Sequence, residues 1–148
     1  MYTRILVAVE NSAYDSAIIN HVADLARLCR SSVVIIHVAD GWVARNIQQL
    51  ALRESDEMKE DRAYIDGLAA QLEQQGIRAE AVLASGNPGQ EICAAAVREQ
   101  CDLIAMATHG HKLFNDMLRG SVANIVRHNT TVPVLLVRGG SPQRTTPS

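Results

Sequence analysis

Ala107-Thr108-His109-Gly110, joined through nine residues to Gly120-Ser121-Val122, lies between two short apolar runs of this chain. The runs are Leu103–Ala107 (LIAMA) and residues 132–137 (VPVLLV), and each has the length of a buried strand. A strand that ends in a glycine-containing loop before a helix exposes unpaired backbone N–H groups, and the helix dipole favours negative charge there. Glycines also let a phosphate approach the backbone closely. This stretch therefore predicts a cradle for the phosphates of a nucleotide.

The composition fits one domain with a sheet that is buried on both faces. The chain has 148 residues, enough for one stable core, and 47% of them are hydrophobic while only 3% are aromatic. A core built from Val, Ile, Leu and Ala suits a parallel sheet. The net charge of -2 gives no electrostatic reason to expect nucleic acid or an anionic membrane as a partner. No apolar run is long enough for a membrane span or a signal-peptide core, so we expect a cytoplasmic protein.

Five apolar segments alternate with helical patterns, and we predict that each forms a strand: residues 5–9, 32–39, 78–84, 102–107 and 132–137. Strands that alternate with helices indicate a parallel sheet with right-handed crossovers. The first, second and fourth segments are the most continuously apolar and belong in the centre. Pro133 lacks a ladder donor, so the fifth strand is expected at a sheet edge or to begin at this residue.

The predicted fold is therefore α/β: a single Rossmann-like, open, twisted parallel sheet of five strands in the order 3-2-1-4-5, with helices on both faces. In this order the topological switch point lies between strands one and four. Ligands bind at such a point, beside the carboxyl ends of the strands. Those ends are Val9-Glu10 and Ala107-Thr108, so the topology and the glycine loop indicate the same crevice.

Cap residues locate the helices between these strands. Ser12 and Asp15 fit a capping box in front of the first amphipathic helix. Gly76 is expected to end the second helix as a left-handed cap. Asn87 is expected to cap the third helix, with Pro88 at its first position.

The connection over residues 40–75 has two apolar stripes of helical spacing, one of Val43, Ile47 and Leu50 and one of Ile65, Leu68 and Leu72. Between the stripes, eight of the ten residues 53–62 are charged. A solvated helical face accounts for this run more simply than a partner-binding surface. One bent helix, or two helices with a loop near Ser55, would both fit the pattern.

The cysteines and the C-terminal segment are expected to carry no function. Cys29, Cys93 and Cys101 are odd in number, lack a C-x2-C spacing and lie within apolar patterns, which is typical of inert buried thiols. Residues 139–148 (GGSPQRTTPS) are expected to form a disordered tail after a domain of residues 1–138.

The glycine stretch resembles the G-x2-G-x9-G-[ST] signature of the universal stress protein family. Gly110, Gly120 and Ser121 match that signature at the right spacing, while Ala107 stands at its first glycine. The resemblance covers residues 5–137, and in the ATP-binding members of the family the signature holds the phosphates and ribose. It implies an adenine nucleotide, ATP or AMP, with Mg or Mn as an accompanying metal. It also implies a homodimer formed through the fifth strand, residues 132–137, whose apolar edge would otherwise be bare.

The resemblance also implies roles for residues outside the signature. Ala8 and Val38 match positions that approach the adenine, and Met106 and Val122 match positions that line the same pocket. Glu10 stands where the family usually carries an Asp near the nucleotide or its metal, although it could equally complement the dipole of the next helix. The full set of expected nucleotide-binding residues is Ala8, Val9, Glu10, Val38, Met106, Ala107, Thr108, Gly110, Gly120, Ser121 and Val122.

Ala107 is expected to weaken nucleotide binding without abolishing it. If this position requires a positive φ, alanine is strained there by about 1 kcal/mol or more. If it does not, the extra methyl group only crowds the ribose.

Basic residues lie within the same loop. His109 and His111 form an H-x-H pair, which makes a poor metal site without a third ligand. Lys112 could reach a β- or γ-phosphate as a point charge. The remaining histidines have no functional constellation around them and are expected to be structural: His21, His37 and His128.

Three functions remain open. The first is a nucleotide-binding regulatory protein that signals through oligomer or partner contacts. The chain has neither a P-loop G-x4-G-K-[ST] nor a dinucleotide G-x-G-x2-G, so those two kinds of nucleotide site are excluded. A slow ATPase would need a group that orients water, for which only Glu10 and His109 are candidates. A dimeric interaction protein without nucleotide is the third. A phosphoacceptor receiver domain is excluded because Glu10-Asn11 and Ser85-Gly86 occupy the places of its acidic residues.

Overall fold

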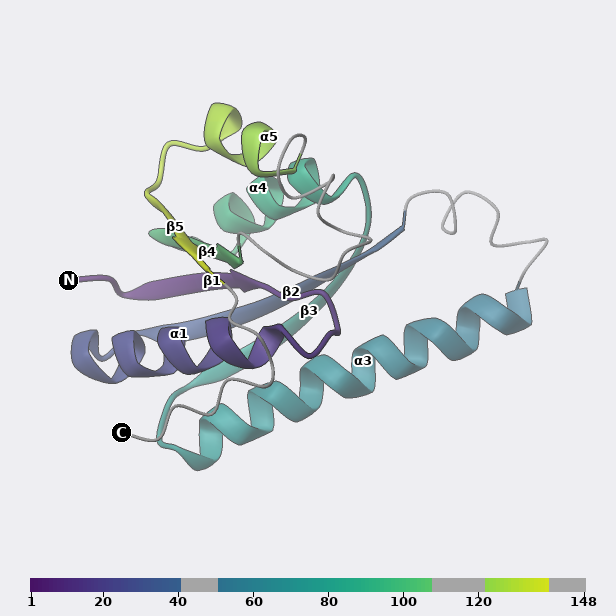
Figure 1. Ribbon diagram of the computed structural model, residues 1–148, viewed down its shortest axis with the longest axis horizontal. Helices are drawn as coiled ribbons and strands as arrows, with labels where there is room; N and C mark the ends of the chain where they lie inside the picture. The colour runs from purple at the N-terminus through teal and green to yellow at the C-terminus, as the bar shows by residue number, and fades with distance from the viewer. Residues whose placement is uncertain (41–50, 108–121, 139–148) are drawn as a thin grey trace.

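The computed structural model describes residues 1–40, 51–107 and 122–138, in which strands alternate with helices (Figure 1). The strands are β1 (Arg4–Ala8), β2 (Ser32–Asp40), β3 (Ala79–Gly86), β4 (Leu103–Ala107) and β5 (Val134–Val137). The helices are α1 (Asp15–Cys29), α3 (Ala51–Gln74), α4 (Pro88–Arg98) and α5 (Val122–Asn129).

The five strands form one parallel sheet in the order β3-β2-β1-β4-β5, which confirms the predicted topology. The three strands that are apolar on both faces, β1, β2 and β4, are each paired on two sides. Pro133 directly precedes the edge strand β5, and its carbonyl accepts a 3.0 Å hydrogen bond from the Ile104 N–H. A residue without an N–H therefore lies where the sheet needs only its carbonyl, as expected.

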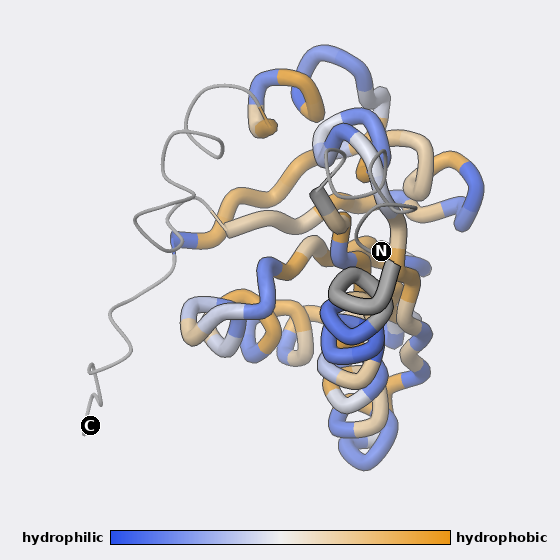
Figure 2. Tube along the Cα trace, turned by 90° about the vertical axis from the view of Figure 1, so that its right-hand side faces the viewer, coloured by the Kyte–Doolittle hydropathy of each residue, from blue (hydrophilic) through white to orange (hydrophobic). Residues whose placement is uncertain are grey.

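Side-chain alternation along the central strands produces two cores, one on each face of the sheet. Ile5 and Val7 of β1 pack into the core that α1 and α3 cover, whereas Leu6 packs into the core that α4 and α5 cover. Figure 1 shows the two helix pairs on opposite sides of the strands, and Figure 2 shows the strands as the most continuously hydrophobic part of the chain. A sheet buried on both faces explains the high content of branched aliphatic residues.

Two of the three predicted helix boundaries are confirmed. Gly76 ends α3 with a φ of 85°, and the Asn87 side chain accepts a 3.1 Å hydrogen bond from the Gln90 N–H at the start of α4. The predicted capping box forms only in part. One half of the box is present, since the Asp15 carboxylate accepts from the Ser12 N–H at 3.0 Å. The other half is not, because the Asp15 N–H donates to the Ser12 carbonyl instead of the Ser12 hydroxyl. The Ser12 hydroxyl accepts from the Tyr14 N–H.

The charged segment belongs to one continuous helix, since α3 runs from Ala51 to Gln74 without a break at Ser55. Ile65 and Leu72 are fully buried, and Leu68 packs against the same core, which confirms the second apolar stripe. The first stripe and the expected tail lie outside the described residues. Within the described part of the chain, no helix combines the length and the apolar character that a membrane crossing requires.

The thiols are less buried than predicted. Cys101 is buried, but Cys29 and Cys93 are only partly so, and all three are free. Burial raises the pKa of the Cys93 thiol, and it raises the pKa of Cys101 to about 11. A raised pKa keeps a thiol in its protonated form, which is the less nucleophilic one.

Candidate functional site

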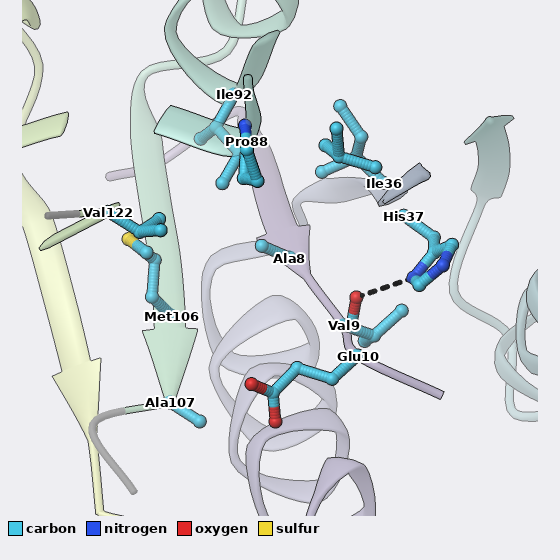
Figure 3. A pocket seen from close by; sticks show the side chains of 11 residues that line it. Ala8, Val9, Glu10, Ile36, His37, Pro88, Ile92, Met106, Ala107 and Val122 are labelled. Atoms are coloured by element: carbon cyan, nitrogen blue, oxygen red, sulfur yellow. Dashed lines mark hydrogen bonds between the residues drawn. The ribbon is translucent and has the colours of Figure 1, made fainter. Parts of the chain in front are cut away.

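A crevice opens at the carboxyl ends of β1, β2 and β4, at the topological switch point of the sheet (Figure 3). The free volume of the crevice, which includes the open solvent at its mouth, is about 630 Å³. The crevice is lined by Ala8, Val9, Glu10, Ile36, His37, Val38, Pro88, Ile92, Met106, Ala107 and Val122.

Strand alternation decides which side chains face the crevice. Ala8 and Met106 stand on the face of the sheet that α4 and α5 cover, and Val38 packs against the same core. The first residues of two helices close the crevice, because Pro88 begins α4 and Val122 begins α5. The walls are consequently apolar and have few hydrogen-bonding groups. Such a surface suits a flat aromatic base.

Seven predicted site residues lie together around this crevice: Ala8, Val9, Glu10, Val38, Met106, Ala107 and Val122. The other four, Thr108, Gly110, Gly120 and Ser121, lie outside the described residues, as do His109, His111 and Lys112. Four lining residues were not predicted from the sequence: Ile36, His37, Pro88 and Ile92. For Pro88 a signal existed, because a helix that begins directly after β3 must start at the same edge of the sheet.

Ala107 is not strained at its position before the glycine loop. It lies in β4 opposite Val137, and the non-glycine residues of the described chain with positive φ are Asn11, Arg30 and Gln100. The alternative that Ala107 requires a positive φ is therefore wrong. What distinguishes it from glycine is only the methyl group at the rim of the crevice.

Glu10 places a carboxyl group in the crevice, between the ends of β1 and β4 (Figure 3). Both carboxyl oxygens are buried, and neither has a hydrogen-bond partner among the described residues. Burial, assisted by the negative charge of Asp15, raises the pKa of Glu10 from 4.5 to about 7. A buried polar group without a partner is costly, so this carboxyl group is available to a ligand. The acid in the first turn of α1 is Asp15 rather than Glu10.

Asp15 is almost fully buried, with 3% of its surface exposed, and three donors converge on it. One carboxylate oxygen accepts from the Glu10 N–H at 3.0 Å. The other accepts from the Ser12 N–H at 3.0 Å and from the Tyr64 hydroxyl at 2.6 Å. Burial and the bond to Asp15 raise the pKa of Tyr64 above its ordinary value. Tyr64 thus remains a donor, and Asp15 joins α1, α3 and the chain segment that carries Glu10.

His37 is not an isolated structural histidine. Its Nδ1 lies 3.0 Å from the Val9 carbonyl at the end of β1 (Figure 3), and its Nε2 lies 3.3 Å from the Asp61 carboxylate on α3. The other oxygen of Asp61 accepts a 3.0 Å hydrogen bond from the Asn11 side chain. Asp61 therefore links α3 to the chain on both sides of Glu10.

The described residues contain no group of three or more His, Cys, Asp or Glu side chains that could hold a metal ion by itself. Glu10 is the carboxylate among the residues that line the crevice. Mg²⁺ in nucleotide sites needs only one or two carboxylates because phosphates and water supply its other ligands. A single Glu at this position fits a metal that arrives with a nucleotide.

Comparison with known proteins gives a consistent family and fold. The model of the universal stress protein family matches residues 1–138. Universal stress protein YxiE of Bacillus subtilis is 26% identical over 93% of this chain and 100% of its own length. The structure of MJ0577 from Methanocaldococcus jannaschii superposes with a TM-score of 0.79 at 25% identity, and covers 95% of this chain and 99% of its own.

Two further universal stress protein structures contain an adenine nucleotide. The protein from Archaeoglobus fulgidus in complex with dAMP has a TM-score of 0.69 at 21% identity, and covers 93% of this chain and 98% of its own. A universal stress protein in complex with cAMP has a TM-score of 0.69 at 16% identity, and covers 94% and 98%. At these identities the likeness is one of fold.

Proposed function

The chain belongs to the universal stress protein family, and on this premise we propose that it is a stress-response regulatory protein that binds an adenine nucleotide, ATP or AMP, in the crevice between β1 and β4. One observation carries the proposal. Seven residues expected at a nucleotide site from the sequence line a single apolar crevice, which lies at the switch point of the sheet. The dAMP and cAMP complexes of other family members support the choice of an adenine ligand.

The chemistry of the crevice fits the parts of such a nucleotide. The base would lie against Ala8, Val38 and Met106, where apolar walls exclude water from its faces. The Glu10 carboxyl group, which has no hydrogen-bond partner among the described residues, would accept from ribose hydroxyls or contact Mg²⁺ or Mn²⁺. The phosphates would then extend past the carboxyl end of β4, where Ala107 lines the crevice.

We further propose that the protein acts as a homodimer in the cytoplasm and signals to a protein partner. The edge strand β5 supports dimerisation, since β4 is its one neighbour among the described strands and Leu136 is 42% exposed. An apolar strand edge pairs readily with a second copy of the same chain.

The test is a titration of the purified, nucleotide-free protein with ATP and with AMP by calorimetry, with and without Mg²⁺. Binding in the micromolar range is expected. Ala8→Leu should abolish it because the larger side chain fills the crevice, whereas Ala13→Leu makes the same change at an exposed position and should bind normally. Absence of binding at millimolar nucleotide would overturn the proposal in favour of a nucleotide-free interaction protein. Steady release of phosphate from ATP would add the slow ATPase activity.

A further inference from the structure

We propose that helix α3 positions the Glu10 loop, residues 9–14 between β1 and α1, for nucleotide binding through two of its side chains, Asp61 and Tyr64. The inference rests on the proposed function, because it assigns positioning residues to that same site. Asp61 and Tyr64 lie three positions apart on one helix, so they face the same side of α3. Neither of them lines the crevice itself.

Tyr64 acts on the loop through Asp15. Its hydroxyl donates to the buried Asp15 carboxylate at 2.6 Å, and that carboxylate accepts from the backbone N–H groups of Glu10 and Ser12. Two loop amides are thereby held by a carboxylate that α3 itself orients. A rigid hydrogen-bonded support of this kind keeps a binding residue in place.

Asp61 acts on the loop at two other points. One of its oxygens accepts from the Asn11 side chain at 3.0 Å, and the other lies 3.3 Å from His37 Nε2. Asn11 has a φ of 63°, a conformation that non-glycine residues adopt at a cost, so its contact with Asp61 helps to hold the turn. Glu10 is consequently flanked by two residues that depend on Asp61: Asn11 directly, and Val9 through His37.

His37 lies between two hydrogen-bond acceptors, the Val9 carbonyl at its Nδ1 and the Asp61 carboxylate at its Nε2. Asp61 is the charged side chain that faces the ring, from α3. The other contact of the His37 ring is the Val9 carbonyl, in the loop that follows β1, and the residue opposite His37 on β3 is the apolar Leu83. The His37 and Asp61 side chains are only 14% and 21% exposed, which shields the pair from solvent.

The effect on nucleotide affinity depends on the fraction of molecules in which the loop holds Glu10 in the binding-competent position. If the loop holds Glu10 in the competent position only part of the time, the apparent affinity falls by that fraction. Loss of either contact from α3 leaves Ala8, Val38 and Met106, against which the base would lie, untouched and reduces this fraction. The structure thereby assigns α3, whose outer face is charged and exposed, an indirect connection to the proposed nucleotide site through Asp15, Asn11 and His37.

The experiment compares Asp61→Asn and Tyr64→Phe with the wild type, and uses Asp66→Asn as the matched control. Asp66 lies on the same helix, with a side chain 57% exposed and a long 3.8 Å contact to Arg62. Each protein is titrated with ATP, and amide hydrogen exchange is followed by NMR without nucleotide. We expect Asp61→Asn and Tyr64→Phe to weaken ATP binding by about three- to tenfold, and Asp66→Asn by less than about twofold.

The exchange measurement separates positioning from a general loss of stability. The Glu10 and Ser12 amides should exchange faster in Tyr64→Phe, while core amides such as that of Ile35 keep their wild-type rates. The NMR signals of the His37 ring should change in Asp61→Asn but not in Asp66→Asn. Exchange that accelerates throughout the sheet would indicate a merely structural role and overturn the inference.

Two other results would also overturn it: unchanged exchange at Glu10 and Ser12 in Tyr64→Phe, or faster exchange with wild-type affinity for ATP. Failure of the proposed function looks different, because the wild type itself would then bind no nucleotide. In that case unchanged loop exchange in both variants would refute the contact from α3. Faster exchange of the Glu10 and Ser12 amides alone would establish that α3 holds the loop, and would overturn its role in nucleotide binding.

Discussion

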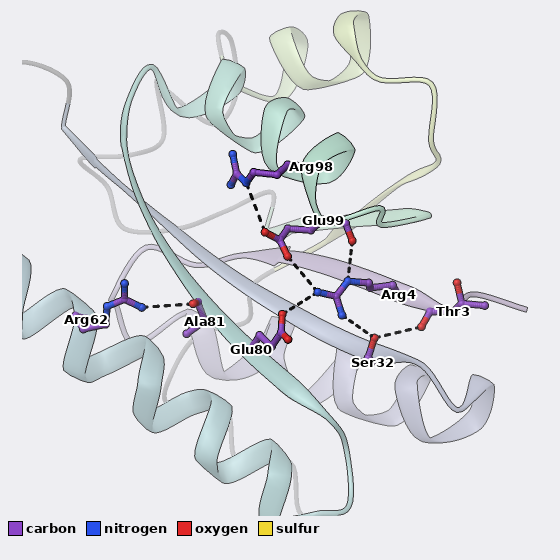
Figure 4. Close-up of polar contacts among 8 residues, drawn as sticks. All are labelled: Thr3, Arg4, Ser32, Arg62, Glu80, Ala81, Arg98 and Glu99. Atoms are coloured by element: carbon purple, nitrogen blue, oxygen red, sulfur yellow. Dashed lines mark hydrogen bonds and ion pairs between the residues drawn. The ribbon is translucent and has the colours of Figure 1, made fainter.

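Arg4 and Glu99 are joined twice at the amino edge of the sheet (Figure 4). The Arg4 Nε donates to the Glu99 backbone carbonyl at 2.7 Å, and its Nη2 lies 3.1 Å from the Glu99 carboxylate. The same Nη2 lies 2.8 Å from the Glu80 carboxylate. The Arg4 side chain thus connects the central strand β1 to β3 and to the residue that follows α4. The planar fork of an arginine is suited to several such bonds at once, which a lysine could not reproduce.

Replacement of Arg4 by Met keeps the apolar stem but removes these bonds. We expect the free energy of unfolding to fall by about 1–3 kcal/mol, because bonds to charged groups are among the stronger ones and Arg4 contacts two carboxylates. Chemical denaturation measures this change. Arg98→Met is the control, since Arg98 is 53% exposed and lies 3.5 Å from Glu99. Arg98→Met should lower the free energy of unfolding by less than about 0.5 kcal/mol. Equal decreases in Arg4→Met and Arg98→Met would contradict the role of Arg4.

Glu10 should make the stability of the protein depend on pH. Its pKa is raised from 4.5 to about 7 in the folded state, so between these values the unfolded chain releases a proton that the folded protein retains. The free energy of unfolding should therefore fall as the pH rises through this window and level off above about 7.

Denaturation curves at about pH 5 and about pH 8 test this dependence. Glu10→Gln should be less sensitive to the change in pH than the wild type, because the ionised carboxylate that opposes folding is gone. Glu57→Gln, at an exposed position of α3, should behave as the wild type does. Parallel profiles for wild type and Glu10→Gln would refute the assigned environment of Glu10.

Two glycines offer a matched pair of substitutions. A Cβ atom on Gly89 would lie 2.7 Å from the Ile125 Cγ2 atom, whereas a Cβ on Gly67 would meet nothing within 4 Å. Gly67→Ala should stabilise the protein by about 1 kcal/mol, through helix propensity. Gly89→Ala should destabilise it by about 1–3 kcal/mol, since α4 and α5 must move apart.

The second substitution should also affect ligand binding. The helix that Ile125 belongs to begins at Val122, which lines the crevice, so Gly89→Ala should weaken ATP binding while Gly67→Ala leaves it unchanged. Thermal denaturation and calorimetric titration measure both effects. Stabilisation by Gly89→Ala would show that the two helices are less closely packed than the structure indicates.

The proposed dimer has its own test at β5. Leu136→Lys places a charge on the apolar edge and should convert a dimer into a monomer, which light scattering at micromolar concentration detects. Leu28→Lys makes the same change on α1, where Leu28 is 83% exposed, and should leave the dimer intact. A monomeric wild type, or a dimer that survives in Leu136→Lys, would exclude assembly through this strand.

The sheet could be predicted from the sequence because its signals are local and repeated. The order of the strands follows from which segments are apolar on both faces, and Pro133 marks the edge strand without any structural information. Asn87 and Gly76 act within their own turns, so short-range rules located them correctly. Ser12 shows the limit of such rules, since its hydroxyl and its carbonyl compete for neighbouring N–H groups, and only the folded backbone decides between them.

The site was only half predictable, for a related reason. Ala8, Val38, Met106 and Val122 were expected from the family resemblance, and they line the crevice. The role of His37 depends on Asp61, which belongs to a different element. The role of Tyr64 likewise depends on a contact between distant elements, because its hydroxyl bonds to Asp15 only when α3 packs beside α1. A carboxylate that appeared to be a helix cap is in fact the meeting point of three donors. Polar networks that join distant elements leave no periodic trace in a sequence, whereas apolar faces do.

The central position of β1 has a consequence for how the chain acquires its structure. The Thr3 N–H donates to the Asp102 carboxylate, 99 positions away, and β1 pairs with β4 in the same region. Pairings between such distant residues form slowly because a long loop must close first. During synthesis at about 5–20 residues per second, one edge of the first strand stays open for several seconds before its partner is made. Until then, an apolar strand intended for the centre of the sheet is exposed to wrong partners, and this interval is when a chaperone would be of most use.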